Sequence, residues 1–268
     1  MVRRNKFKKR FGQHLLIDKN HLRKIINAID LKPDDLVLEI GAGTGILTKE
    51  LAKCAKKIYA VEVERDVIKQ LKTNVGDIQN VEIIEADFLK LDLNKIFDKP
   101  FIVVGNIPYN ITSQILIKLF GEIDNIPNHL WMLRKVFLTI QLEVAKRIIA
   151  NPGNKEYSPL SILVQYFTDP EILFKVPANA FHPRPKVNSA FVCFNVKEKL
   201  QKVNNPTLLK KLIRTAFQQR RKKIINSINK VFTDKKVLTQ KLNSLNLDQN
   251  LRAEDLEFEK YLELSNSL

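Results

Sequence analysis

Cysteine is scarce in this sequence: Cys54 and Cys193 are the two cysteines, and they lie far apart without a CxxC spacing. The four histidines are equally scattered and follow no metal-ligand pattern. These absences argue against a disulfide framework and against a zinc site. We therefore expect no metal ion and a reduced, cytoplasmic setting.

Long apolar runs are also missing, because no stretch approaches the roughly 18 to 20 uninterrupted apolar residues of a membrane-spanning helix. The opening MVRRNKFKKR lacks the apolar segment of a secretion signal. A basic start can also open an organellar transit peptide, but this one is short and has no serine before the globular pattern begins. We expect no membrane partner.

Acidic residues are too few to balance the basic ones, so the net charge is +16 and the pI is near 9.7. Residues 1–10 contribute +6 and residues 198–268 contribute +7, which leaves +3 for everything between. Basic charge gathered at two ends predicts docking to a polyanion such as nucleic acid. The alternative is that the surface lysines only keep the chain soluble.

Strand-like and helix-like patterns alternate in the first part of the chain. Helical spacing from about residue 19 is followed by LVLEIGAG, KKIYAVEVE, NVEIIEADF and PFIVVGN, with helical patterns such as residues 67–74 between them. This alternation predicts an α/β fold with a parallel sheet. Further on, EILFKV and SAFVCFNV are expected to form an antiparallel pair at the sheet's edge.

The β character ends after Val196, where an apolar helical stripe begins behind Pro206. Arg220 and Arg221 interrupt that stripe. Either the helix breaks at QQRRKK and leaves the arginines in water, or two arginines emerge from an apolar face; we expect the break. The predicted organisation is a basic arm over residues 1–10, an α/β domain over residues 11–197 and a helical domain over residues 198–268.

EIGAGTG places Gly41, Gly43 and Gly45 at the carboxyl end of the first long strand, where glycine permits a sharp turn and close approach of a ligand. The spacing is not the GxGxxG of dinucleotide sites, and no lysine follows as in a P-loop. The next two strands end on Glu62 and Asp87. Together these features predict an adenosine-like ligand, with Glu62 accepting from a ribose; singly, each acid is equally consistent with a solvated surface carboxylate.

GNIPYN sets a polar corner at the end of the buried strand FIVV. The Asn106 amide oxygen and a nearby main-chain carbonyl can accept from an exocyclic amine, while the ring of Tyr109 stacks on a planar base. An ordinary strand-to-helix turn, with Asn106 as a cap and Tyr109 in the core, is the alternative.

The ordered set RFGQHLL, EIGAGTG, VEVE, EADFL, GNIPYN and FHPRPKVNSA resembles the rRNA adenine N6,N6-dimethyltransferases, from about Phe11 to the C-terminus. Two branches share most of these motifs. The FGQ opening, FQQRRKKIINSI and LRAEDLEFEKYLEL are similar to the KsgA/RsmA branch, which acts on small-subunit (16S) rRNA, rather than to the Erm resistance branch. The resemblance implies a Rossmann-like class I methyltransferase sheet with a small all-helical C-terminal domain, and S-adenosylmethionine as cofactor.

The resemblance also implies roles for individual residues. It assigns six residues to the S-adenosylmethionine pocket: His14, Leu16, Gly41, Glu62, Asp87 and Asn106. The glycine-turn pattern adds Gly43 and Gly45 to the predicted cofactor site. By the same resemblance Tyr109 and Phe181 would stack on the two faces of the target adenine. With the turn residues Asn106, Ile107 and Pro108, they make up the predicted catalytic site. His14 and Leu16 would not have been chosen from the sequence pattern alone.

The implied reaction dimethylates N6 of two adjacent adenosines in a hairpin loop near the 3′ end of small-subunit rRNA during ribosome biogenesis. We expect a monomer whose partners are small-subunit rRNA and the immature 30S particle. The basic run at the helix break is predicted to contact rRNA phosphates: Arg220, Arg221, Lys222 and Lys223. Two alternatives remain open: an Erm-type large-subunit methyltransferase, and an assembly factor in which catalysis is secondary.

Overall fold

The computed structural model describes residues 14–232 and 234–266, so the predicted basic arm lies outside the described residues. The described chain divides into two compact units, each treated by itself below. The first unit takes residues 14–118, Asn128–Leu142 and Glu171–Asn195, and the second takes Leu119–Pro127, Glu143–Pro170 and residues 196–266. The boundary predicted after residue 197 stays a prediction, since the second unit also includes two earlier segments.

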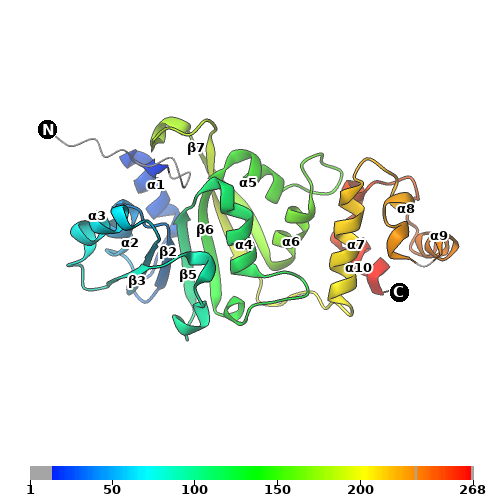
Figure 1. The fold of residues 1–268 in the computed structure, drawn as a ribbon, viewed down its shortest axis with the longest axis horizontal. Coiled ribbons are helices and arrows are strands. Elements are labelled where there is room, and N and C mark those ends of the chain that lie inside the picture. The colour runs from blue at the N-terminus through cyan, green and yellow to red at the C-terminus, as the bar shows by residue number, and fades with distance from the viewer. Residues whose placement is uncertain (1–13, 233, 267–268) are drawn as a thin grey trace. The chain divides into compact units, whose positions relative to one another are not determined.

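The first unit is built on a sheet that, among the described residues, has seven strands in the order β4-β3-β2-β5-β6-β9-β7 (Figure 1). The strands are β2 (Leu36–Ile40), β3 (Lys57–Glu62), β4 (Val81–Glu85), β5 (Phe101–Asn106), β6 (Leu133–Gln141), β7 (Thr168–Val176) and β9 (Ser189–Val196). Strands β4, β3, β2, β5 and β6 pair in parallel, and β9 runs antiparallel to β6. The predicted parallel α/β sheet is confirmed, and β7 lies at its edge beside β9 as expected.

Largely apolar runs explain why the central strands are buried. Residues 101–105 of β5 and residues 37–40 of β2 are all buried, which is typical of parallel strands covered on both faces. The helices of this unit are α1 (Lys19–Ile29), which precedes β2, and α2 (Ile46–Leu51), α3 (Arg65–Val75) and α4 (Thr112–Phe120), which follow β2, β3 and β5. The first of these begins at the predicted place because Asp18 caps it, accepting from the His21 backbone N–H at 2.8 Å.

Short elements complete the first unit. A two-stranded sheet joins β1 (Leu15–Leu16) to β8 (Phe181–His182) in antiparallel fashion. Single 3₁₀ turns lie between the longer elements: η2 (Phe88–Lys90), η3 (Leu93–Lys95), η4 (Tyr109–Ile111), η5 (Asn128–Trp131) and η6 (Ala178–Ala180). The β1–β8 pair brings the start of the described chain against a segment more than 160 residues later.

The second unit is mainly helical among its described residues, and it also takes residues 168–170 at the start of β7. Its elements are α5 (Leu142–Ile148), α6 (Pro159–Phe167), α7 (Pro206–Gln218), α8 (Ile224–Ser227), η7 (Asn229–Val231), α9 (Lys235–Ser244), η8 (Ala253–Asp255) and α10 (Phe258–Asn266). Pro206 opens α7 behind the cap Asn205, and α7 packs against α6, α8 and α10. The predicted break is confirmed, because α7 ends at Gln218 and α8 begins at Ile224.

Candidate functional site

The carboxyl ends of β2, β3, β4 and β5 lie along one edge of the sheet. The register places Ile40 of β2 opposite Gly105 of β5, and Glu62 of β3 opposite Glu85 of β4. The glycine-rich turn, Glu62 and Asn106 therefore leave the sheet at the same edge. In open α/β sheets this edge is where ligands bind.

The glycine-rich turn is bent, and its glycines differ in how closely other residues approach them. Gly41 has a φ of +71°, and its N–H donates to the Val61 carbonyl at 2.9 Å. A Cβ at Gly41 would have the Asn106 carbonyl oxygen as its nearest neighbour, at 3.7 Å, whereas one at Gly43 would lie 2.9 Å from a Leu15 methyl carbon. The turn therefore keeps Gly41 accessible while β1 covers Gly43.

Glu62 is 2% exposed and is held by the turn that it faces. One of its carboxylate oxygens accepts from the Gly43 N–H at 2.9 Å. The other accepts from the Val63 and Glu64 N–H groups at 2.8 and 3.0 Å. Three backbone donors thus fix the carboxylate at the end of β3, where it was predicted to lie.

Two other predicted cofactor residues support local structure. Gly45 is the N-terminal cap of α2 with a φ of +85°. Asp87 caps η2, where one of its oxygens accepts from the Leu89 N–H at 3.0 Å. The predicted contact of Asp87 with a bound adenine stays a prediction.

Asn106 is tied to the start of the described chain. Its Nδ2 donates to the His14 carbonyl at 2.6 Å, and His14 Nδ1 lies 2.6 Å from the Pro183 carbonyl. These bonds connect the end of β5 with the residue before β1 and the residue after β8. The amide orientation leaves Asn106 Oδ1 as an acceptor, which is the role that the sequence predicts for it.

The predicted base-stacking residues lie beside Asn106. The Tyr109 hydroxyl lies 2.5 Å from Ser189 Oγ, and its ring centroid is 5.5 Å from that of His14. Burial raises the pKa of Tyr109, and the Ser189 hydrogen bond opposes that rise. Phe181 differs from the expectation in its exposure: it is 2% exposed and belongs to the hydrophobic core of the first unit. Stacking on a base would require its side chain to move.

A small cavity of about 30 Å³ opens at the strand ends. Among the predicted residues it is lined by Leu16, Gly41 and Asn106. Sequence reasoning missed the other polar residues of its wall, which include Glu39 and Thr139. The available signal for Glu39 was an acid next to the end of the otherwise apolar strand LVLEI.

Glu39 is 1% exposed, and its Oε2 has no hydrogen-bond partner among the described residues. Burial raises the pKa of its carboxyl to about 8; the nearby charge of Glu62 adds to the rise, and the Thr48 hydroxyl opposes it. A buried carboxyl without a cationic partner favours its neutral form. Near neutral pH, Glu39 therefore carries a proton.

The Glu39 carboxyl is expected to make the free energy of unfolding fall as pH rises. Its pKa is about 8 in the folded protein against an ordinary 4.5, so the folded state holds a proton that the unfolded state has released between these values. The stabilising contribution is complete below pH 4.5 and is lost as pH rises toward 8, by up to about 1.4 kcal/mol per pH unit. Urea denaturation of the wild type and Glu39→Gln at pH 5 and pH 7 measures this loss. The wild type should lose roughly 2 to 3 kcal/mol more than the variant; equal losses would contradict a buried neutral carboxyl.

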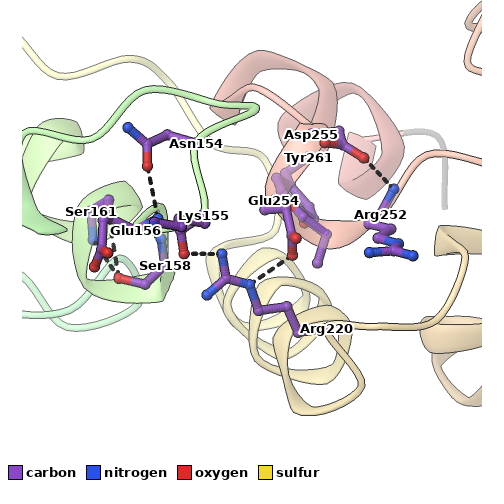
Figure 2. Close-up of polar contacts among 11 residues, drawn as sticks. Asn154, Lys155, Glu156, Ser158, Ser161, Arg220, Arg252, Glu254, Asp255 and Tyr261 are labelled. Carbon is purple, nitrogen blue, oxygen red and sulfur yellow. Dashed lines mark hydrogen bonds and ion pairs between the residues drawn. The ribbon is translucent and has the colours of Figure 1, made fainter.

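The four basic residues at the break between α7 and α8 do not have equal surroundings. Figure 2 shows Arg220 between the Glu254 carboxylate, 2.7 Å from its Nε, and the Lys155 carbonyl, to which it also donates. The Lys223 ammonium donates to Asn250 Oδ1 at 2.7 Å. The other two, Arg221 and Lys222, are exposed. Within the second unit these two are the better placed for phosphate contacts.

Metal and membrane features are absent from residues 14–232 and 234–266. No group of three or more side chains in this part of the chain is arranged to hold a metal ion. None of the helices described there has the length and apolar character needed to cross a bilayer.

A model of the ribosomal RNA adenine dimethylase family matches residues 4–268. The chain belongs to this family. The ribosomal RNA small subunit methyltransferase A of Acaryochloris marina is 42% identical over 263 residues, which is 97% of each chain. The protein of the same name from Alkaliphilus metalliredigens is 39% identical, covering 97% of this chain and 91% of its own.

Solved structures agree with this dimethylase assignment. A dimethyladenosine transferase from Plasmodium falciparum has 30% identity and a TM-score of 0.75, with 94% of this chain and 96% of that chain covered. The 23S rRNA methyltransferase ErmE has 24% identity and a TM-score of 0.73, covering 95% and 99%. At that identity ErmE shows the fold alone. The predicted class I methyltransferase fold is confirmed.

S-adenosylmethionine is the methyl donor of this dimethylase, and the residues at the strand ends fit it. The donor carries a sulfonium and an ammonium, and two buried acids, Glu39 and Glu62, lie at this edge. The unpartnered Oε2 of Glu39 is a feature that a cationic ligand would satisfy, and Gly41 lines the same cavity. The cavity is too small for the whole donor, so most of the donor would lie along the strand ends outside it.

Proposed function

We propose that this protein transfers methyl groups from S-adenosylmethionine to N6 of two adjacent adenosines in a hairpin loop near the 3′ end of small-subunit (16S) rRNA, giving N6,N6-dimethyladenosine. The observation that carries this proposal is the turn Asn106-Ile107-Pro108-Tyr109 at the end of β5, beside the glycine turn and the cavity. The relatives named small subunit methyltransferase support the small-subunit substrate.

The Asn106 turn would act on the nucleophile. The N6 lone pair of adenine is delocalised into the purine ring, which makes it a poor nucleophile. Hydrogen bonds from N6 to Asn106 Oδ1 and to the Ile107 carbonyl favour a more tetrahedral nitrogen, so they stabilise the transition state more than the ground state. The His14 carbonyl supports this geometry by holding the other end of the Asn106 amide at 2.6 Å.

The placement of the target base against the donor methyl group supplies the remaining rate enhancement. When bound, S-adenosylmethionine provides an activated methyl group, so the chain needs no strong general base. The proton on N6 becomes acidic once the nitrogen gains positive charge. Holding the target base at contact distance, with Pro108 fixing the turn and Tyr109 stacking on the ring, can contribute up to roughly 7 to 11 kcal/mol. The pocket must also accept one methyl where a hydrogen-bonding proton lay before.

The Tyr109–Ser189 hydrogen bond is expected to orient the stacking ring. Ser189→Ala should lower kcat by about three- to tenfold while leaving donor affinity unchanged, since one neutral hydrogen bond is lost away from the donor. Steady-state methylation of unmethylated small-subunit particles, with donor binding measured separately, checks this. Tyr109→Phe removes the same hydrogen bond by deleting its other partner. If the bond is the cause, the double variant Ser189→Ala/Tyr109→Phe should be no slower than either single variant. Additive losses would contradict a role through this bond.

Arg221 and Lys222 are proposed as rRNA contacts. The double variant Arg221→Glu/Lys222→Glu should weaken binding to the small-subunit particle by at least about tenfold at moderate salt and leave donor affinity unchanged, because phosphate contacts are electrostatic. Filter binding across a salt series measures it. The exposed pair Lys95→Glu/Lys99→Glu in the first unit is the control with the same change in net charge. Equal losses in the two variants would show an effect of net charge alone.

The finer partners remain part of the proposal. We propose that the immature 30S particle is the substrate, that the protein acts as a monomer and that it works in the cytoplasm. RNA is read largely by shape and by exposed single-stranded bases, so a hairpin loop displayed on a particle suits one flipped adenosine at a time. An assembly role without catalysis is the second candidate, but the complete Asn106 turn argues against it.

The test of the proposed function compares substrates. Labelled S-adenosylmethionine is incubated in parallel with unmethylated 30S particles, unmethylated 50S particles and naked 23S rRNA. Label on the small-subunit particle alone is the expected result. Label on large-subunit RNA would move the protein to the Erm-type reaction, and particle binding without label would favour the assembly role.

A further inference from the structure

A cavity of about 740 Å³ opens within the second unit, and the reaction proposed above makes no use of it. Its wall is formed by positions within residues 149–170, 197–201 and 257–259, all of which belong to that unit. Protein pockets that hold a ligand commonly measure about 300 to 1,000 Å³. The cavity is therefore large enough to bind a ligand group.

Part of the cavity wall is aromatic. Tyr157 is 2% exposed and Tyr166 is 7% exposed, and both line the cavity together with Phe258. The ring centroids of Tyr166 and Phe258 lie 5.2 Å apart, with 41° between the ring planes. Aromatic faces attract cations and also stack on planar groups such as a guanidinium or a nucleobase. The rings alone thus allow either a cation or a base.

Several polar groups of the wall are already bound within the protein. The Tyr166 hydroxyl donates to the Gln201 carbonyl at 3.1 Å, and the Gln165 side-chain amide donates to two backbone carbonyls. The Lys197 ammonium donates to the Gln165 carbonyl at 2.6 Å and lies 3.5 Å from the Asp169 carboxylate. The charges of Lys197 and Asp169 therefore largely neutralise each other.

Other groups of the wall lack a partner. Three exposed charged side chains have no ion-pair partner among the described residues: Glu257, Glu259 and Lys199. The Tyr157 hydroxyl has no hydrogen-bond partner in the part of the chain that the structure describes, although its side chain is almost fully buried. Burial raises the pKa of this hydroxyl, and the nearby charges of Glu259 and Glu257 add to the rise. Two carboxylates and a hydroxyl thus stand against one ammonium.

The loop that carries Tyr157 is held in place before any ligand binds. Arg220 joins the Lys155 carbonyl to the Glu254 carboxylate, as Figure 2 shows. The Gly153 N–H donates to the Glu254 carbonyl at 2.7 Å. A wall that is already ordered loses little conformational entropy when a ligand binds. The ring and hydroxyl of Tyr157 are therefore preorganised for an occupant of the cavity.

An anion suits this cavity poorly. A phosphate at the start of α10 would meet Glu257 and Glu259, while the Lys197 ammonium is already neutralised by Asp169. A cation can pair with the two free carboxylates, donate to the Tyr157 hydroxyl oxygen and lie against an aromatic ring. A guanidinium does all three at once, because it is planar and has five N–H donors in a fixed arrangement.

We propose that this cavity binds an arginine side chain from a basic segment of a partner protein. Proteins that bind nucleic acid often carry such segments, and arginine is a frequent anchor of protein interfaces. This chain has a net charge of +16, so a basic partner is repelled by its overall charge and needs a local acidic site. The inference goes beyond the proposed function. Placing the partner on the ribosomal particle rests on that function.

The test is a titration of the full chain with short capped peptides, followed by NMR of its backbone amides. One peptide carries a single arginine between glycines, and the matched peptide carries citrulline, which has nearly the same shape without the charge. The arginine peptide should shift the amides of Tyr157 and residues 257–259 in a saturable way. The citrulline peptide should bind roughly tenfold more weakly or worse, since hydrogen bonds to charged groups are lost.

Substitutions in the wall locate the site. Glu257→Gln/Glu259→Gln should weaken binding of the arginine peptide by roughly tenfold or more, and Tyr157→Phe by about threefold. The control Glu198→Gln/Glu263→Gln makes the same change in net charge at two acids of the second unit that do not line the cavity. It should leave the affinity within about twofold of the wild type. The citrulline comparison uses the wild type and so does not depend on the stability of any variant.

Spermidine and adenosine monophosphate serve as alternative ligands in the same titration. Tighter binding of adenosine monophosphate than of the arginine peptide would show a nucleotide site, and binding of spermidine without binding of the arginine peptide would show a polyamine site. Either result would overturn the inference, as would a lack of saturable binding or equal losses in the two double variants. None of these measurements involves methyl transfer, so such a failure leaves the proposed function standing. A protein that binds the arginine peptide but methylates no rRNA would contradict the proposed function alone.

Discussion

Asn106→Ala should lower kcat for methyl transfer by roughly a hundredfold or more, the size of effect seen when one preorganised transition-state hydrogen bond is removed. The side-chain Nδ2 donates a 2.6 Å hydrogen bond to the His14 carbonyl, which leaves Oδ1 as the acceptor proposed for the target N6. Without that acceptor, N6 keeps its lone pair in the purine ring. Single-turnover methylation of unmethylated small-subunit particles at saturating donor measures the change.

Donor binding should survive this substitution. Asn106 is one of several residues around the cavity, so the donor Kd is expected to change by less than about tenfold. Asn106→Asp is a sharper comparison, because it keeps an acceptor but loses the N–H that bonds to His14. Asn106→Asp should also have a low kcat, because the hydrogen bond to His14 that orients the acceptor is lost. Loss of donor binding with normal turnover at saturation would contradict the role given to Asn106.

Glu62→Ala should weaken donor binding by roughly 10- to 150-fold, the range for losing hydrogen bonds to a charged group. The carboxylate accepts from the Gly43, Val63 and Glu64 N–H groups, so its removal disturbs the glycine turn as well as the proposed ribose contact. Isothermal titration with S-adenosylmethionine measures the loss. Turnover at saturating donor should fall much less than affinity.

A neighbouring acid provides the control for Glu62. Glu85 lies opposite Glu62 in the register of β3 and β4, but its side chain is exposed and pairs with Lys72. Glu85→Gln should therefore leave donor affinity within about twofold of the wild type, as for most surface substitutions. Equal losses in the two variants would mean that the charge of this edge binds the donor, without a specific role for Glu62.

Much of the fold could be predicted because each of these helices and strands is determined by a pattern within a short stretch of sequence. The strands β2, β3, β4 and β5 are short apolar runs bounded by turn residues, and α1 shows its apolar spacing directly in the sequence. The glycine turn and the residues ending the strands follow from that order, since parallel strands deliver their carboxyl ends to one edge. The end of α7 could be predicted because two arginines, Arg220 and Arg221, interrupt the apolar stripe of the sequence.

The rest depends on contacts between residues distant in sequence. The hydrogen bond from Asn106 to His14 spans 92 positions, and that between Tyr109 and Ser189 spans 80. No pattern within a short window reveals such pairs, so His14 entered only through the family resemblance and Ser189 was missed. Arg220 shows the same limit, because its partner Glu254 lies 34 residues away and its sequence context suggested only solvated charge.

The most direct test of the central claim is to map the product on small-subunit rRNA. Unmethylated 30S particles are treated with the wild type or with Asn106→Ala, and the RNA is examined by primer extension and by mass spectrometry of its nucleosides. The account predicts N6,N6-dimethyladenosine at two adjacent positions in one hairpin loop near the 3′ end with the wild type, and almost none with the variant. Methylation at another atom, at a single isolated adenosine or equally with both proteins would contradict it.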